Sequence, residues 1–531
     1  MIRNPILPGF HPDPSICRVG ETFYIATSTF EWYPGVRIYA SEDLVNWRFA
    51  AAPLDRAALL DMRGNQDSGG IWAPCLSHDG ERFWLVYTDV KRLDGAFKDA
   101  HNYITACETT DGEWCDPWYV NSSGFDPSLF HDDDGRKWFT NMQWNHRGNG
   151  TGGNPAHASF DGILLQEWSP ERGLVGEKRN IFAGTERGLT EAPHLFKRNG
   201  YYYLTTAEGG TGYEHAVTLA RSRDIWGPYE VHTQKFVMTA KGHPDHPIQR
   251  TGHGQYVEGI DGRHWHTFLM GRPIPGPDGK GAFCPLGRET GIAPVVWKDD
   301  WLWLEDGGLL APEAVAVEAT PTEPEAISYD FDAGLHHDLQ WLRTPASERI
   351  FRIEKGTLVL TGRESIGSWF EQALVARRQQ HHSYRAETAV DISPTTYQQA
   401  AGLTTYYNRH KFHAVVVSYE PGMGRVLTIQ SCPGNWPDGE LEHPLDAPVP
   451  LTEGCVELAV DVNGATQQFF YRQGDHWMAI GPELNAAVIS DEGGRGEHAS
   501  FTGAFVGMVA YDVSGEAMEA RFGRFSYEPR G

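Results

Sequence analysis

The sequence has 531 residues, a formal charge of −25, 59 glycines and an aromatic content of 12%. This length predicts two or more domains, and the negative charge argues against nucleic acid or an anionic membrane as a partner, because both would be repelled. Aromatic residues combined with many turn residues favour an all-β fold.

The sequence also gives an expectation for the cell compartment. No apolar run reaches the roughly 18 residues of a membrane span, and the opening "MIRNPILPGF" lacks the apolar core of a signal peptide. The seven cysteines are odd in number and have no CxxC spacing, which fits reduced thiols better than a disulfide framework. We therefore expect a cytoplasmic protein.

The first motif along the chain is "HPDPS", in which Asp13 stands between two prolines. Each proline fixes its own φ, and the residue before a proline is biased towards extended backbone. We therefore expect Asp13 to be rigid and extended, which suits a catalytic carboxylate and equally suits an ordinary turn.

The start of this motif recurs through the first three hundred residues with a period of about 50 to 65 residues. The copies are "DPSI" (13–16), "APCL" (73–76), "DPSL" (126–129), "APHL" (192–195) and the weaker "GHGQYV" (252–257). Each copy is followed by a turn and an aromatic-rich strand, such as "GETFYIATSTF" or "GERFWLVYTDV". Short strands at this period are typical of propeller blades, so we predict a five-bladed β-propeller over residues 1–306.

Carboxyl groups occupy related positions in three of the five copies. Asp13 and Asp126 directly precede the repeat proline, and in "LTEAPHL" the acid moves to Glu191, two residues before Pro193. Because the first strand of each blade lines the central channel, these residues are predicted to converge there. The alternative for each acid is that it only caps a turn.

Other side chains near these motifs are candidates for substrate or ion binding. Aromatic faces suit the C–H faces of sugars, and the candidates are Phe30, Trp32, Trp72 and Trp144. Arg288 would bond substrate hydroxyls or a catalytic carboxylate, or else form a surface ion pair with Glu289. His253 in the fifth copy is the candidate metal ligand. We expect no cofactor for the chemistry itself, and a structural calcium ion in the channel is the candidate ion.

The second half of the chain has a different pattern. Residues 307–328, rich in Pro, Ala and Glu, break the repeat and predict a linker. Beyond it, alternating segments such as "SYRAETAVDI" and "FHAVVVSYE" predict a β-sandwich of the concanavalin or jelly-roll kind over residues 329–531.

Several motifs together resemble the two-domain β-xylosidases of glycoside hydrolase family 43, and the resemblance extends over nearly the whole chain. The motifs are "GFHPDPSI", "TSTFEWYPGV", "DSGGIWAP", "GFDPSLFHDDDG", "TEAPHL", "TAEGGTGYEHA" and "AFCPLGRET". One departure is "WAPC", where "WAPD" is expected, so that Cys75 puts a local hydrogen bond in doubt.

The resemblance implies a five-bladed propeller, an inverting mechanism and a role for each acid. Asp13 would be the general base, Glu191 the general acid, and Asp126 the residue that orients this acid and raises its pKa. Glu186 in "GTERG" lies outside the motif. Phe505 in "FTGAFVG" would reach the propeller mouth and narrow the site.

These observations predict an exo-acting inverting glycoside hydrolase that releases xylose from the non-reducing ends of short β-1,4-xylo-oligosaccharides. An α-L-arabinofuranosidase, or an enzyme with both activities, is the alternative on the same fold. A noncatalytic carbohydrate-binding propeller would predict an incomplete acid set, whereas this set is complete. The oligomeric state stays open, with a homo-oligomer among the alternatives.

Overall fold

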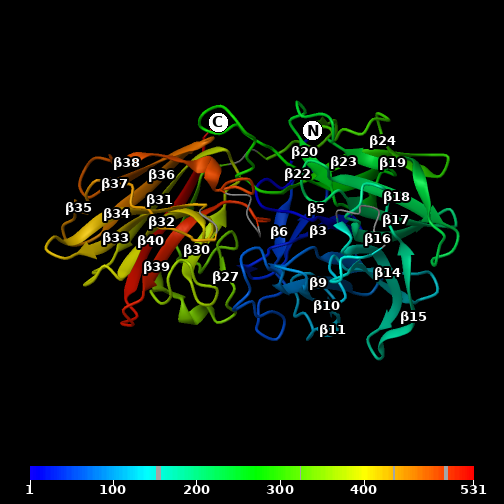
Figure 1. The fold of residues 1–531 in the computed structure, drawn as a ribbon, viewed down its shortest axis with the longest axis horizontal. Helices are drawn as coiled ribbons and strands as arrows, with labels where there is room; N and C mark the ends of the chain where they lie inside the picture. Colours follow the sequence, from blue (N-terminus) through cyan, green and yellow to red (C-terminus); the bar gives the residue numbers. More distant parts are fainter. Residues whose placement is uncertain (151–156, 323–324, 435–436, 495–499, 531) are drawn as a thin grey trace.

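The protein consists of two β-sheet domains that lie side by side (Figure 1). The computed structural model describes residues 1–150, 157–322, 325–434, 437–494 and 500–530. The blue-to-green part of the ribbon is a five-bladed propeller and the yellow-to-red part is a two-sheet sandwich, which confirms the predicted fold class. The described part of the chain includes the short 3-10 segments η2 (Ser347–Arg349) and η3 (Ala486–Val488). None of the helices in the described part of the chain has the length and apolar character needed to cross a membrane.

Each propeller blade is an antiparallel sheet of four or five strands that follow one another in the sequence. Blade one contains β2 (Ser15–Val19), β3 (Thr22–Thr27), β5 (Arg37–Ser41) and β6 (Arg48–Ala51). Blade two contains β7 (Gly70–Ile71), β8 (Cys75–His78), β9 (Phe83–Arg92), β10 (Asp99–Cys107) and β11 (Trp118–Asn121). Blade three contains β12 (Ser128–His131), β13 (Lys137–Trp144), β14 (Phe160–Ser169) and β15 (Gly173–Phe182). Blade four contains β16 (Glu191–Arg198), β17 (Tyr201–Glu208), β18 (Ala216–Ser222) and β19 (Glu230–Thr239), and blade five contains β20 (Gln249–Gly252), β21 (Tyr256–Glu258), β22 (His264–Gly271), β23 (Glu289–Lys298) and β24 (Trp301–Leu304).

The first strands of the blades contact one another around the axis. β2 contacts β8, β8 contacts β12, β12 contacts β16, and β21 of blade five contacts β2. The residues that immediately precede these strands therefore meet at one end of the channel, as the repeat predicts.

The predicted linker is docked on the propeller. Within it, β25 (Ala314–Val315) pairs with β1 (Ile2–Arg3), so the start of the chain and the segment after blade five are joined. Positions 323 and 324 lie outside the described residues. β26 (Ile327–Tyr329) pairs with a sandwich strand, so the sandwich begins within the last residues of the predicted linker.

Two antiparallel sheets form the sandwich. One contains β26, β28 (Phe351–Glu354), β29 (Thr357–Thr361), β31 (Ser383–Asp391), β36 (Val456–Asn463), β37 (Thr466–Arg472), β38 (Met478–Asn485) and β40 (Glu519–Pro529). The other contains β27 (Gln340–Leu342), β30 (Ala373–Arg378), β32 (Gln399–Asn408), β33 (Lys411–Glu420), β34 (Gly424–Pro433), β35 (Val449–Pro450) and β39 (Phe505–Asp512). Along β31 every second side chain is buried, because alternate residues of a strand point to opposite faces.

The second sheet ends on a strand from the propeller. β4 (Trp32–Tyr33), which lies between two strands of blade one, pairs with β27 through Leu342 and Trp341. The indole of Trp32 also stacks on the ring of Phe505 at a centroid distance of 3.6 Å. The two domains thus share a sheet and an apolar core, which fixes the sandwich against the propeller face that carries the catalytic motifs.

Candidate active site

A cavity of about 370 Å³ lies where the blades meet at the axis. Its lining includes all three predicted acids, Asp13, Asp126 and Glu191, together with Phe30, Trp72, Trp144, His253 and Arg288. Positions far apart in the sequence are therefore brought to one cavity by the repeat. Two of the predicted site residues, Trp32 and Phe505, are absent from this wall; both are fully buried and their rings stack on each other.

The backbone of the catalytic motifs is left-handed rather than extended. Asp13 has φ of +57° and Asp126 has φ of +53°, and Ala192, which precedes the repeat proline of blade four, has φ of +54°. The expectation of an extended Asp13 is therefore wrong. The following proline disfavours the right-handed helical region, and aspartate is one of the few residues that enters the left-handed region readily. Such conformations cost about 1–3 kcal/mol and persist where surrounding contacts hold them.

Asp13 is held as a carboxylate by three neighbours. The Ser28 hydroxyl donates to its Oδ2 at 2.6 Å, and Arg288 Nη1 donates to its Oδ1 at 3.0 Å. His253 Nδ1 lies 3.4 Å from the same Oδ1. Burial alone would raise the pKa of Asp13, but Arg288, His253 and Ser28 outweigh it and lower the pKa below its usual range. Asp13 is therefore ionised at neutral pH.

Glu191 and Asp126 have the opposite electrostatic setting. Burial, followed by repulsion from Asp13, raises the pKa of Glu191 to about 8. Burial also raises the pKa of Asp126, and repulsion from Glu191 adds to it, while the backbone N–H of Ala192 favours its ionised form. The side chain of Glu191 accepts or donates no hydrogen bond within the described part of the chain. Because two buried carboxylates repel each other, the pair holds a proton near neutrality, and the unbonded carboxyl of Glu191 faces the cavity.

Aromatic rings form much of the cavity wall. Trp72 lies between Phe30, at a centroid distance of 6.2 Å, and Phe125, at 4.9 Å. Trp144 packs edge-on against Phe160 at 5.5 Å. These walls provide the apolar faces that a sugar ring needs. Trp72 and Trp144 are also fixed by their indole N–H groups, which donate to the carbonyls of Ser68 and Ala96.

The wall also contains residues that the sequence analysis did not single out, among them Phe125, Phe160 and Lys98. Phe125 directly precedes Asp126, so its place in the repeat was a usable signal. Phe160 begins β14 and pairs with Trp144 of β13, which also lines the cavity. Lys98 gives no motif signal; its ammonium lies 4.4 Å from the centroid of the Trp144 ring, and burial lowers its pKa.

The sandwich reaches the cavity through Phe501 rather than Phe505. Phe501 lines the cavity, its ring lies 6.1 Å from Trp72, and its carbonyl accepts from Arg288 Nη2 at 2.8 Å. Phe505 is fully buried between Trp32 and Phe10. The physical reason is that Phe505 begins β39, where pairing with β30 and β32 directs its side chain into the domain interface.

Two alternatives for individual residues are excluded by their contacts. Arg288 is only 2% exposed and binds Asp13, while Glu289 forms a two-bonded ion pair with Arg272 at 2.7 and 2.8 Å. The predicted alternative of a surface pair between Arg288 and Glu289 therefore does not occur. Glu186 is exposed and pairs with Lys235, away from the cavity wall.

The surroundings of His253 do not match a calcium site. Calcium takes six to eight oxygen ligands, whereas His253 presents a nitrogen to Asp13, whose carboxylate is already bound by Arg288 and Ser28. Burial lowers the pKa of His253 to about 4, so the ring is neutral at physiological pH. Within the described residues His253 does not join a group of three possible metal ligands. A calcium ion in the channel next to His253 stays a prediction.

A β-propeller whose axis carries one ionised and one protonated carboxyl group between aromatic walls is the framework of a glycoside hydrolase. Residues 2–302 match the family model described as glycosyl hydrolases family 43, and residues 328–528 match the model described as the beta xylosidase C-terminal concanavalin A-like domain. The chain belongs to glycosyl hydrolase family 43.

The chain is similar to several named relatives over nearly its full length. It is 56% identical to xylosidase/arabinosidase 43B of Humicola insolens, covering 99% of this chain and 98% of the relative. It is 45% identical to the beta-xylosidase of Bacillus subtilis, with 100% of both chains covered. A crystal structure of xylan beta-1,4-xylosidase from Bacillus halodurans C-125 superposes with a TM-score of 0.93 at 46% identity, covering 99% of this chain and 100% of the other.

Proposed function

We propose that the protein is an exo-acting, inverting β-xylosidase that removes xylose from the non-reducing ends of short β-1,4-xylo-oligosaccharides. The observation that carries the proposal is the opposite protonation of two carboxyl groups in one cavity. Asp13 has a lowered pKa and Glu191 has a raised pKa, which are the states required of a general base and a general acid at neutral pH.

The reaction follows from these two states. Asp13 takes a proton from a water molecule, which attacks the anomeric carbon of the terminal sugar from one face. Glu191 gives its proton to the glycosidic oxygen, which leaves with the shortened oligosaccharide. The attack and departure occur on opposite faces, so the configuration at the anomeric carbon inverts. Asp126 disfavours the ionised form of Glu191, so that Glu191 stays protonated until it protonates the glycosidic oxygen.

The position of Phe501 supports exo action. Both polar backbone groups of Phe501 are hydrogen-bonded. Its N–H donates to Ser68 Oγ at 3.0 Å, and its carbonyl accepts from Arg288. A sandwich residue is therefore held in the wall of the cavity, and a wall built from both domains is expected to block one direction of the substrate chain and to admit only its end. The neutral substrate also suits a protein of formal charge −25.

The second candidate function is α-L-arabinofuranosidase activity in the same cavity. It is supported by the 56% identity to a relative named xylosidase/arabinosidase. The two sugars are neutral, isomeric pentoses that differ in ring size, and aromatic walls can pack against the C–H faces of either ring.

Rates on nitrophenyl β-D-xyloside and nitrophenyl α-L-arabinofuranoside, measured side by side, test the proposal. We expect a higher kcat/KM for the xyloside, and loss of both activities in Asp13→Asn. Preference for the arabinofuranoside would support the second candidate. No release from either substrate by the wild-type protein would contradict both and favour a noncatalytic carbohydrate-binding propeller.

A further inference from the structure

A second cavity, of about 180 Å³, lies between blade one and the sandwich. It shares no lining residue with the active-site cavity. The propeller side contributes Arg37 on β5 and His11 on the N-terminal segment, and the sandwich side contributes Arg377 and Arg378 at the end of β30. The remaining lining residues are Tyr39, Trp47, Phe49, His337, Asp338 and Gln380.

The three arginines are buried among neutral partners. Arg37, Arg377 and Arg378 are 2%, 5% and 4% exposed. Arg37 donates to the Tyr39 hydroxyl at 2.8 Å and to the His337 carbonyl at 2.7 Å. Arg377 donates to the Tyr329 hydroxyl and to the Gln380 side chain. These bonds satisfy N–H groups without neutralising any charge.

Arg378 is the least satisfied of the three. Its Nε donates to the Phe10 carbonyl at 2.6 Å and its Nη1 to the Gln340 side chain, but its buried Nη2 has no hydrogen-bond partner. Burial, with repulsion from Arg37, lowers the pKa of Arg378 to about 9. A buried guanidinium nitrogen without an acceptor is costly, because its hydration is lost and nothing replaces it.

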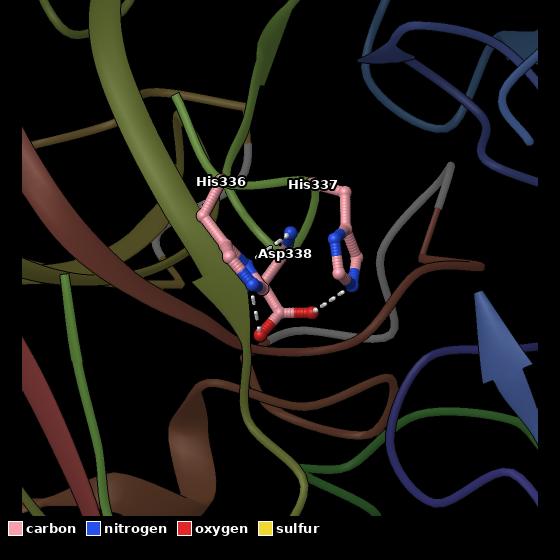
Figure 2. Close-up of side chains that lie close together, drawn as sticks. All are labelled: His336, His337 and Asp338. Atoms are coloured by element: carbon pink, nitrogen blue, oxygen red, sulfur yellow. Dashed lines mark hydrogen bonds and ion pairs between the residues drawn. The ribbon is translucent and has the colours of Figure 1, made fainter. Parts of the chain in front are cut away.

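The negative charge of the described lining residues comes from Asp338 alone. Its carboxylate accepts from the Tyr329 hydroxyl at 2.7 Å. It also lies 3.5 Å from the imidazoles of both His336 and His337, and Figure 2 shows these two rings on either side of it. Burial lowers the pKa of His337 to about 4, so this ring adds no charge. Three guanidinium groups and one carboxylate leave two positive charges in the cavity wall.

His11 is neutral as well. Its Nδ1 lies 3.0 Å from the Pro8 carbonyl, which can only accept, so Nδ1 carries the proton. Its Nε2 then accepts from the Tyr39 hydroxyl, 2.6 Å away. Burial, with repulsion from Arg378 and Arg37, holds the pKa of His11 well below its usual value.

The two uncompensated positive charges in the wall of this cavity favour an anionic ligand. His336, His337 and Asp338 have the spacing of a possible metal site, but Arg37 and Arg377 act on Asp338 and would repel a cation. We propose that the cavity binds a small oxyanion, of which inorganic phosphate and sulfate are the simplest members, through Arg37 of the propeller and Arg377 and Arg378 of the sandwich. The planar guanidinium group can donate two parallel hydrogen bonds to two oxygens of such an anion.

A bound oxyanion would bridge the two domains. Its contacts to Arg37 come from the propeller, and its contacts to Arg377 and Arg378 come from the sandwich. Because the bridge exists only in the docked, folded protein, binding stabilises that state by mass action. This inference does not depend on the proposed function, because the active-site cavity is a separate one.

Calorimetric titration of the full-length wild-type protein with inorganic phosphate, and separately with sulfate, tests the proposal. We expect saturable binding near one site per chain, and a rise of a few degrees in Tm at a hundredfold excess over Kd. Sodium chloride at matched ionic strength should leave the Tm unchanged. Absence of saturable binding by the wild type to either anion overturns the proposal without recourse to any variant.

One variant from each domain then locates the bound anion. Arg37→Gln and Arg377→Gln each keep a polar group and remove one charge, and at least a tenfold rise in Kd is expected for each. Arg48→Gln on β6 of the same blade is the matched control, because Arg48 is exposed and pairs with Glu42. Binding of wild-type strength in either folded cavity variant, or a loss in Arg48→Gln equal to theirs, would overturn the assignment.

Discussion

Arg288 joins Asp13 to the sandwich: its Nη1 donates to the Asp13 carboxylate at 3.0 Å and its Nη2 to the Phe501 carbonyl at 2.8 Å. The guanidinium lies with its carbon 5.2 Å from the centroid of the Phe30 ring. One buried side chain therefore sets the charge of the proposed base and positions the residue that closes the cavity. The C-terminal domain is in this way part of the active site.

Removal of the Arg288 charge should change the acidic limb of the pH profile. Arg288 lowers the pKa of Asp13, so in Arg288→Gln this pKa rises and the acidic limb of kcat/KM moves to higher pH. Loss of a charge-assisted hydrogen bond costs about 1.5–3 kcal/mol, so we expect kcat/KM at neutral pH to fall about 10- to 100-fold. An acidic limb at its wild-type pH in a folded variant would show that Asp13 does not set it.

Replacement of Glu191 should depend on the leaving group. Glu191→Ala should slow hydrolysis of xylobiose by about 10²- to 10⁴-fold, because its poor leaving group needs the proton. An aryl xyloside with a good leaving group should be much less affected. Glu186→Ala is the matched control, because Glu186 is an exposed glutamate five residues earlier that pairs with Lys235. Equal losses on both substrates would remove Glu191 from the acid role.

The alkaline limb should depend on Asp126. The acid must be protonated, and the pKa of Glu191 is raised to about 8, so activity should decline as the pH rises through this region. Ionised Glu191 raises the pKa of Asp126, and because this repulsion is mutual, an ionised Asp126 disfavours the ionised form of Glu191. Asp126→Asn keeps the shape and removes this repulsion. The alkaline limb should therefore move to lower pH, while the acidic limb moves much less. Because the carboxyl groups titrate together, the comparison is of apparent values; an unmoved alkaline limb leaves Asp126 with only a structural role.

The sequence was sufficient for the propeller and for the three acids, because the repeat and the motifs specify both. Asp13 and Asp126 hold equivalent positions and Glu191 lies one residue earlier in its own repeat, and a ring of blades brings such related positions close together. The left-handed φ of Asp13 could not be predicted in this way, since the preference before proline excludes one region without selecting between the others.

The choice between Phe501 and Phe505 also depended on tertiary structure. Both lie in or beside one short aromatic motif, and only the pairing of β39 with its neighbours directs Phe505 into the interface. The pairing of β4 with β27 likewise could not be predicted from the sequence. A strand of two residues is too short to show an alternating pattern, and its partner lies in the other domain.

These two phenylalanines should respond differently to truncation. Phe505→Ala removes a ring that is stacked on Trp32 and fully buried, so the free energy of unfolding should fall by about 3–5 kcal/mol. The kcat/KM of the molecules that remain folded should change little. Phe501→Ala should instead raise KM with a small effect on Tm, because the ring is partly exposed to the cavity. Thermal denaturation and kinetics of both variants check this, and a reversed pattern would restore Phe505 as the wall residue.

In the proposed mechanism Asp13 activates water while Glu191 protonates the leaving oxygen in the same step. The anomeric form of the first xylose released shows directly whether the configuration inverts. Proton NMR during the first minutes of hydrolysis of an aryl β-xyloside should show the α-anomer of xylose before mutarotation. Accumulation of β-xylose first would mean that a carboxylate attacks the sugar and that water enters in a second step, which would contradict the assignment of Asp13 as the base.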